Sequence, residues 1–147
     1  MHALDPAVLS WLRRHHDVAT VEELVELGLT DDQVRMLVRR KQLVRAHRGV
    51  YRLAGAPASP HSRARALCLA NADVVIGDLS ASSLWEFRGV PRVAHVRGLA
   101  PPGARCPAGS GVVLRRSSVI EDEDIVRWPD GIRLTNLAEE LKAVGLA

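Results

Sequence analysis

An arginine-rich segment between residues 31 and 41 holds the side chains best suited to contacting a nucleic acid. At about 100° per residue in a helix, Gln33, Arg35, Met36 and Arg39 fall on one polar arc. Glutamine can pair with the edge of adenine, and arginine can bind guanine through two hydrogen bonds. We therefore predict that these four side chains contact base edges in duplex DNA.

Positive charge is concentrated in residues 33–72, which contain no aspartate or glutamate although the net charge of the chain is only +3. A one-sided basic segment is typical of a surface that contacts phosphates. A solvated face with no partner is the alternative, because charge runs are often no more than that. Arg63 and Arg65 belong to this segment. The phosphate contacts that we predict are Arg40, Lys41, Arg45, His47, Arg48 and Arg52.

Helix-start motifs define the elements that would position these side chains. Asp5 can cap a helix and Pro6 suits its first position, so we expect a short helix that ends near Arg14. Thr20 and Glu23 have the spacing of a capping box, in which each side chain accepts a hydrogen bond from the other residue's backbone. A second helix is therefore predicted from residue 21.

A third helix follows after a tight turn. Gly28 can end the second helix in a left-handed conformation, and Thr30 with Gln33 forms another capping box. Two capped helices separated by such a turn are typical of a helix-turn-helix. The face opposite the polar arc should pack on the other two helices, and it carries Val34, Leu37 and Val38.

Two short strands, residues 43–47 and 50–53, are predicted to form a hairpin with Arg48 and Gly49 at its tip. A hairpin in this place is the wing of a winged helix-turn-helix, which we assign to residues 1–55. Alternation along the strands predicts two sets of side chains. We expect Val44, Ala46, Tyr51 and Leu53 to face inward, and Arg45, His47 and Arg52 to face outward.

Residues 56–147 are predicted to form a second, small mixed α/β domain, so the fold class is α+β. Residues 55–60 resemble a linker, and residues 99–111, with three prolines and three glycines, resemble a loop. The remaining elements follow from apolar patterning. We predict helices over 61–72, 80–87 and 136–144, and strands over 74–76, 93–96, 112–116, 125–128 and 132–134.

A nuclease signature can also be read in the sequence. Pro129 and Asp130, followed by Glu140 and Lys142, match the Pro-Asp…Glu-x-Lys pattern of restriction-like enzymes, whose carboxylates bind Mg²⁺. Glu140 and Lys142 would have to share a face, as on a strand, but their segment is typical of a helix, where they point about 200° apart. We therefore expect no nuclease activity, and DNA cleavage lost in Asp130→Ala would contradict this.

No other group of residues forms a catalytic or cofactor site in the sequence. His15 and His16 are adjacent and cannot share a face, so capping of a helix end is the better interpretation. The acidic residues 121–124 lack the central glycine of a calcium loop. Trp85 and Phe87 are interpreted as core residues, since only five aromatic residues are available. We predict no enzyme activity, no metal and no cofactor.

The cysteines and the N-terminus indicate a reduced, cytoplasmic setting. Cys68 lies in an apolar stretch and should be buried, Cys106 lies in the proline- and glycine-rich loop, and no CxxC pair occurs. The chain has no run of about 18 apolar residues, and its first residues lack the basic and apolar regions of a signal peptide. We therefore expect a soluble, cytoplasmic protein.

An ordered series of short motifs gives a family resemblance. Residues 43–53 read LVRAHRGVYRL, residues 80–85 read SASSLW, and residues 130–135 read DGIRLT. Together with the capped helix pair, this series resembles the AbiEi-type antitoxins and related winged-helix regulators of actinobacteria, over about residues 15 to 138. The resemblance implies an operator-binding winged helix-turn-helix followed by a small α/β domain.

The resemblance also implies a biological setting. Antitoxins of this type repress their own operon, and a nucleotidyltransferase-like toxin is encoded beside them. It therefore implies double-stranded operator DNA as a partner and a toxin counteracted with or without direct contact. The resemblance does not decide whether the chain binds operator DNA as a monomer or as a homodimer on repeated sites. Many relatives continue into a nuclease-like domain, and we expect this chain, which stops at residue 147, to be a truncated or minimal form.

A second function remains compatible with the same pattern. Winged helices also serve as protein-interaction modules, and a basic surface can meet an acidic partner instead of DNA. A third alternative is that the chain is the remnant of a nuclease-fused protein. The absence of acidic residues from 33 to 72 favours DNA over a protein partner, because surfaces that dock proteins usually carry both signs of charge.

Overall fold

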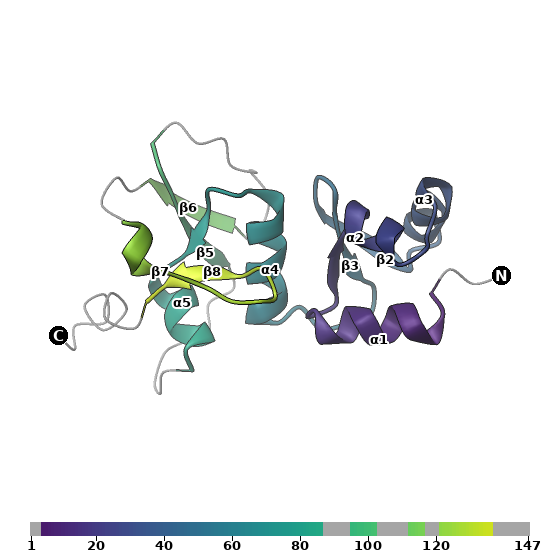
Figure 1. The fold of residues 1–147 in the computed structure, drawn as a ribbon, viewed down its shortest axis with the longest axis horizontal. Helices are drawn as coiled ribbons and strands as arrows, with labels where there is room; N and C mark the ends of the chain where they lie inside the picture. Colours follow the sequence, from purple (N-terminus) through teal and green to yellow (C-terminus); the bar gives the residue numbers. More distant parts are fainter. Residues whose placement is uncertain (1–3, 87–94, 103–111, 117–120, 137–147) are drawn as a thin grey trace.

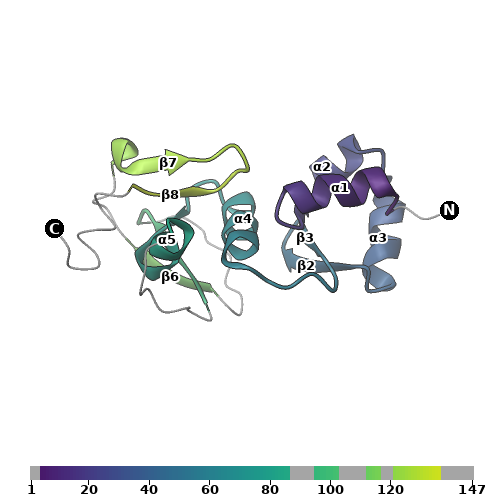
Figure 2. The same cartoon turned by 90° about the horizontal axis from the view of Figure 1, so that it is seen from below.

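The computed structural model describes residues 4–86, 95–102, 112–116 and 121–136, which form two lobes connected by a short linker (Figure 1). The N-terminal lobe contains three helices and a small sheet, and the second lobe contains a larger sheet with helices. The α+β class predicted from the sequence is confirmed. In both views α3 lies at the end of the molecule farthest from the second lobe (Figures 1 and 2).

The helices of the N-terminal lobe begin at the predicted caps. Asp5 accepts a hydrogen bond from the amide of Val8 at 2.9 Å and caps the first helix. Both threonine capping boxes are formed, at Thr20 and at Thr30. Gly28 ends the second helix with φ +102°, in the left-handed region that glycine adopts readily. The three helices are α1 (Pro6–Arg14), α2 (Val21–Glu26) and α3 (Asp31–Arg39).

The sheet of this lobe has three strands, one more than predicted. Strand β1 (Val18–Thr20) lies between α1 and α2 in the chain and pairs with β3 (Val50–Leu53), which also pairs with β2 (Leu43–His47). The strand order is therefore β1-β3-β2, with all pairs antiparallel. Helix, strand, two helices and a hairpin in this order form a winged helix-turn-helix.

The predicted assignment of side chains to the two faces of the hairpin is wrong for Val44, Arg45 and Ala46. Val44 pairs with Arg52 and Arg45 pairs with Tyr51, and residues opposite each other in a ladder share a face. Tyr51 faces the helical core, whereas Val44 lies on the other face and is 40% exposed. A β-bulge between Arg45 and His47 then shifts the alternation. Arg45, His47 and Arg52 therefore do not share an outward face.

The second lobe is built on a mixed sheet of five strands in the order β6-β5-β4-β8-β7. The central pair β4–β8 is parallel, as is β5–β6, whereas β4–β5 and β7–β8 are antiparallel. Its helical segments are α4 (Pro60–Ala70), α5 (Asp78–Leu84) and a 3₁₀ turn at Asp122–Asp124. The strands are β4 (Val75–Ile76), β5 (Val96–Ala100), β6 (Val112–Arg116), β7 (Ile125–Arg127) and β8 (Arg133–Thr135).

Most elements of this lobe lie close to their predicted positions, with one clear error. We expected a strand over 93–96 and a loop from residue 99, but β5 starts at Val96 and includes Leu99 and Ala100. Gly98 in the middle of β5 weakens the strand signal in the sequence. A Cβ there would lie 2.8 Å from the Val74 side chain, so the packing requires glycine. Phe87, Cys106 and, of the helix predicted over 136–144, residues 137–144 lie outside the described residues.

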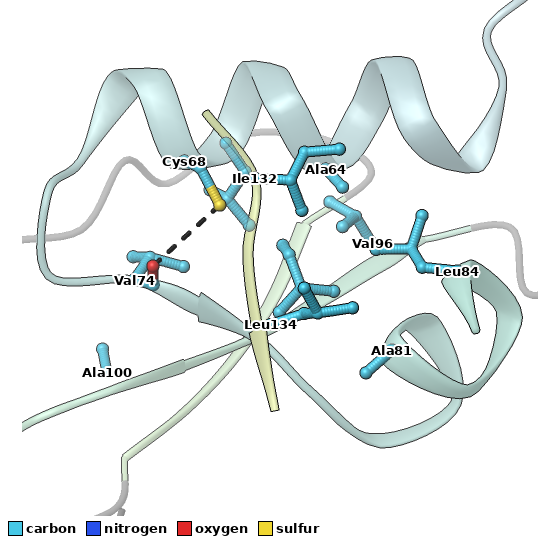
Figure 3. Packing of buried hydrophobic residues seen from close by; sticks show 11 residues of the cluster. Ala64, Cys68, Val74, Ala81, Leu84, Val96, Ala100, Ile132 and Leu134 are labelled. Atoms are coloured by element: carbon cyan, nitrogen blue, oxygen red, sulfur yellow. Dashed lines mark hydrogen bonds between the residues drawn. The ribbon is translucent and has the colours of Figure 1, made fainter. Parts of the chain in front are cut away.

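The core of the second lobe lies between its sheet and helices α4 and α5 (Figure 3). Cys68 is buried, as predicted, and its thiol donates a long hydrogen bond to the Val74 carbonyl. Trp85 packs against this core and donates from Nε1 to the carbonyl of Thr135 at 2.9 Å, which confirms the core interpretation. The fully buried side chains include Leu67, Val74, Ile76, Ile132 and Leu134.

Helix α4 lies between the two sheets and is the main connection between the lobes (Figure 2). Ala66 packs with Val18 and Val50 of the small sheet, and Leu67 packs in the core of the larger one. Both faces of the small sheet are thus covered, one by α1–α3 and the other by α4. This explains why the hairpin does not show the simple alternation of a sheet with one solvent face.

Candidate nucleic-acid interface

Helix α3 has one buried face and one exposed, basic face. Val34 and Leu37 are 3% and 1% exposed and anchor the helix on the core of the N-terminal lobe. Arg35, Arg39 and Arg40 are exposed on the other side. The anchored face fixes the helix axis, so the exposed face is presented as a rigid ridge that could enter a major groove.

Gln33 has a structural role at the start of α3. Its side-chain oxygen accepts a hydrogen bond from the Thr30 amide at 2.8 Å, and the Thr30 hydroxyl accepts one from the Gln33 amide at 3.1 Å. Pairing with adenine needs both the oxygen and the nitrogen of the glutamine side chain. In this conformation the oxygen is engaged in the capping box. Met36 is half-buried beside it.

Arg35 forms an ion pair within α3. Its guanidinium lies 3.7 Å from a carboxylate oxygen of Asp32, and both side chains are largely exposed, at 76% and 95%. A pair this exposed contributes little stability, about 0 to 1 kcal/mol. Arg35 can therefore leave Asp32 for another acceptor at small cost, although the charge of Asp32 would oppose a nearby phosphate.

The end of α3 and the tip of the hairpin carry the other predicted phosphate contacts. Arg40 caps the C-terminus of α3, and Lys41 follows with φ +60°. Both side chains are exposed, as are those of Arg45 and Arg48. Arg48 lies at the turn of the hairpin between β2 and β3, next to Gly49. We refer to Arg35, Arg39, Arg40, Lys41, Arg45 and Arg48 as the basic end of the lobe.

His47 and Arg52 are separate from the basic end, although we predicted them as phosphate contacts. Arg52 lies on the hairpin face that α4 covers, and its Nη1 donates a hydrogen bond to the Ala56 carbonyl at 2.9 Å. His47 is half-buried on the same face, and burial lowers its pKa below the ordinary value. Both side chains line a cavity between the hairpin and the second lobe.

Arg65 is not part of any basic surface, which corrects its inclusion in the basic segment. It is 2% exposed and lies where α4 meets the N-terminal lobe. Its Nη2 lies 3.0 Å from both carboxylate oxygens of Glu23, and its Nε donates to the Val18 carbonyl at 3.2 Å. Its Nη1 donates to the carbonyl of Asp130. A buried arginine that binds three separate segments of the chain has a structural role. The sequence pattern alone does not reveal this role.

His16 and Asp130 form a second connection between the lobes. His16 Nε2 lies 2.8 Å from a carboxylate oxygen of Asp130, whose other oxygen accepts from the amide of Ile132 at 3.2 Å. Asp130 is the residue that the nuclease pattern would have assigned to Mg²⁺; Glu140 and Lys142 lie outside the described residues. His15 stacks on Trp11 and hydrogen-bonds its carbonyl at 2.7 Å, near the end of α1.

Within the described residues, no three His, Cys, Asp or Glu side chains come together in a way that could hold a metal ion. Among the helices of the same residues, none has the length and apolar character needed to cross a membrane.

The fold and the exposed basic helix define a winged helix-turn-helix lobe of the type found in transcriptional regulators. Residues 6–54 match the family model described as "Transcriptional regulator, AbiEi antitoxin". The resemblance predicted from the sequence motifs is confirmed over this segment. The motifs at 80–85 and 130–135 lie outside it.

Similarity to a solved structure extends beyond residues 6–54 into the second lobe. The RV2827C protein from Mycobacterium tuberculosis has a similar fold, with a TM-score of 0.51 and 25% sequence identity. The match covers 75% of this chain and 43% of that protein, so this chain spans less than half of its length. A search of curated proteins gave no significant match.

Proposed function

We propose that this protein is a cytoplasmic, DNA-binding transcriptional regulator that represses its own operon as an antitoxin. The observation that carries this proposal is α3, whose apolar face is buried while Arg35, Arg39 and Arg40 are exposed at the end of the molecule. Arg35 and Arg39 would contact guanine edges in the major groove. Arg40, Lys41 and Arg45 would contact phosphates beside it, and Arg48 would reach the neighbouring groove.

The antitoxin part of the proposal is supported by the family match over residues 6–54. An antitoxin role implies that the gene of this protein lies beside a gene that encodes a nucleotidyltransferase-like toxin, and that this protein counteracts the toxin. Promoter sites for such repressors are often repeated, so two copies of the chain would bind neighbouring half-sites as a homodimer. The counteraction of the toxin can be tested by expressing the toxin gene with and without this chain. Growth should recover only when the chain is present.

DNA binding can be tested by titrating labelled duplex DNA at several salt concentrations. If about four to six phosphates are neutralised per subunit, log affinity should fall with log salt at a slope of about −4 to −5. The double variant Arg35→Ala/Arg39→Ala should lose sequence-specific binding. A salt-independent affinity would contradict electrostatic binding to the DNA backbone.

A matched control changes the same number of charges far from α3. Arg115 on β6 and Arg127 on β7 are exposed in the second lobe, so Arg115→Ala/Arg127→Ala lowers the net charge equally. We expect this control to bind operator DNA as the unmodified chain does. If both double variants bind equally well, or selection from random DNA yields no specific site, the basic end contacts an acidic protein instead.

A further inference from the structure

A cleft between the hairpin and the second lobe shares only Arg45 with the proposed DNA contact among the described residues. It consists of two adjoining cavities of about 250 Å³ each. One lies against β2, β3 and α4, and the other lies between the start of α4, α5 and β5. Arg63, Ala58 and Val96 line both cavities, so Arg63 stands at their junction.

The polar lining of this cleft is cationic or neutral. Arg63 and Arg52 line the same cavity together with His47 and Arg45. Ser80, Ser83 and His95 line the other cavity. No aspartate or glutamate is found among the described lining residues of either one. Two guanidinium groups without a neighbouring carboxylate are a setting that favours an anionic ligand.

Arg63 in particular has no neutralising partner within the described part of the chain. It is half-buried on α4, and neither an ion pair nor a side-chain hydrogen bond engages its guanidinium there. Its neighbour Arg65, two residues along the same helix, is fully engaged by Glu23 and backbone carbonyls. A partly desolvated arginine without a partner is costly, which an anion in the cleft would relieve.

Apart from Ser62, the remaining described lining of the cavity against the hairpin is apolar and small. The apolar side chains come from β2, α4, β5 and β6, and they are Val44, Ala46, Ala66, Val96 and Val112. Val44 is 40% exposed there, a large value for a valine next to a packed interface. A hydrophobic surface with a few convergent polar groups is the usual composition of a small-molecule site.

We propose that this cleft binds a small organic anion, whose carboxylate or phosphate contacts Arg63 and Arg52 and whose apolar part packs on the valine and alanine side chains. The ligand would touch the hairpin and the second lobe at once, so it would fix their arrangement. This inference goes beyond DNA binding and does not depend on it. Both cavities are small, and the one lined by β2 and β3 lies between the lobes, which suits a small molecule better than a duplex.

The test uses three probes of similar size on the full chain, followed by amide shifts in ¹H–¹⁵N spectra. Benzoate and phenyl phosphate carry the two candidate anionic groups, and benzyl alcohol is the neutral comparison. We expect saturable shifts around Arg63 and Val96 with at least one anion, and affinity for benzyl alcohol lower by at least about tenfold, the effect of losing a charged hydrogen bond. The stronger of the two anions identifies the group that the site takes. Equal binding of the neutral probe, no binding of either anion, or shifts elsewhere would overturn the proposal.

Variants of Arg63 add an independent check. Arg63→Gln should weaken anion binding by at least about tenfold, Arg63→Lys should retain part of it, and Arg127→Gln on the far strand should change nothing. Unchanged binding in Arg63→Gln would contradict the site. If Arg63→Gln fails to fold, the comparison of benzoate with benzyl alcohol on the unmodified chain still tests whether the cleft prefers an anion. If operator DNA moves the same amides and neither small anion does, the cleft contacts DNA phosphates and the proposal is wrong.

Discussion

Arg65 of the second lobe holds Glu23 of the N-terminal lobe, with its Nη2 at 3.0 Å from both carboxylate oxygens. Glu23 also accepts a hydrogen bond from the Thr20 amide at 2.9 Å and thereby completes the capping box of α2. One carboxylate therefore serves the helix-turn-helix and the junction between the lobes. The position of α2, and of α3 that packs beside it, depends on a residue 42 positions away in the sequence.

Removing this buried arginine should strongly destabilise the protein. Arg65→Met keeps most of the side-chain volume but leaves Glu23 and two carbonyls without their donor, so we expect a loss of about 3 kcal/mol or more in the free energy of unfolding. Urea denaturation measures it. Arg63→Met, on the same helix and with no ion pair to lose, should cost less than about 1 kcal/mol. Similar losses in the two variants would mean that the contact with Glu23 contributes little.

The N-terminal lobe could be predicted well from the sequence because its signals are local. The capping boxes at Thr20 and Thr30 and the turn at Gly28 fix helix ends through contacts three or four residues apart. Strand β1 was missed because three residues, Val18–Thr20, are too few to show alternation. Its pairing with β3 is a contact between distant parts of the chain, which no local pattern records.

The candidate site could be predicted only in part, for a related reason. Exposed side chains on α3 follow from helical periodicity, so the exposure of Arg35 and Arg39 could be predicted. The surroundings of Arg52 and Arg65 are set by α4 packing on the small sheet, which periodicity does not predict. The residues of the cleft, such as Ser83 and His95, are brought together by the fold and share no sequence motif.

The two roles of Gln33, capping and base contact, can be separated by substitution. Gln33→Glu keeps an oxygen for the Thr30 amide and adds negative charge at a helix N-terminus, so stability should be unchanged or rise by about 0.5 kcal/mol. The added charge should repel DNA and lower operator affinity. Thermal unfolding and DNA titration measure the two effects. Thr30→Ala, which removes the other half of the cap, should instead cost about 1 kcal/mol of stability. A large loss of stability in Gln33→Glu would contradict this account of the cap.

Protonation of His61 should weaken the junction between the lobes. Burial is the main cause that lowers the pKa of His61, and the nearby His16, whose ring centre lies 5.0 Å away, adds to it against the opposite effects of Asp130 and Glu86. Because the unfolded chain then binds the proton more readily, stability should fall as the pH drops below the ordinary pKa of 6.5. Unfolding free energy measured between about pH 7 and pH 5 tests this.

The matched variants for this pH dependence are His61→Gln and His95→Gln. His61→Gln removes one titrating group and should make the pH dependence less steep, while His47, whose pKa burial also lowers, continues to contribute. His95→Gln replaces a histidine at an exposed position and is the control. An equally steep loss of stability in His61→Gln would show that other groups, rather than His61, cause the acid sensitivity.

The hairpin offers a comparison of two arginines four residues apart that the structure places differently. Arg48 is exposed at the tip, whereas Arg52 is half-buried on the α4-facing side and donates to the Ala56 carbonyl. If the tip contacts a phosphate, Arg48→Ala should reduce the magnitude of the salt slope of DNA binding by about 1. Arg52→Ala should leave that slope unchanged, because its side chain does not point toward the basic end. Titrations over a range of salt concentrations measure both slopes. An equal reduction in the two variants would mean that DNA reaches the α4-facing side of the hairpin, and that the covered face of the wing opens when DNA binds.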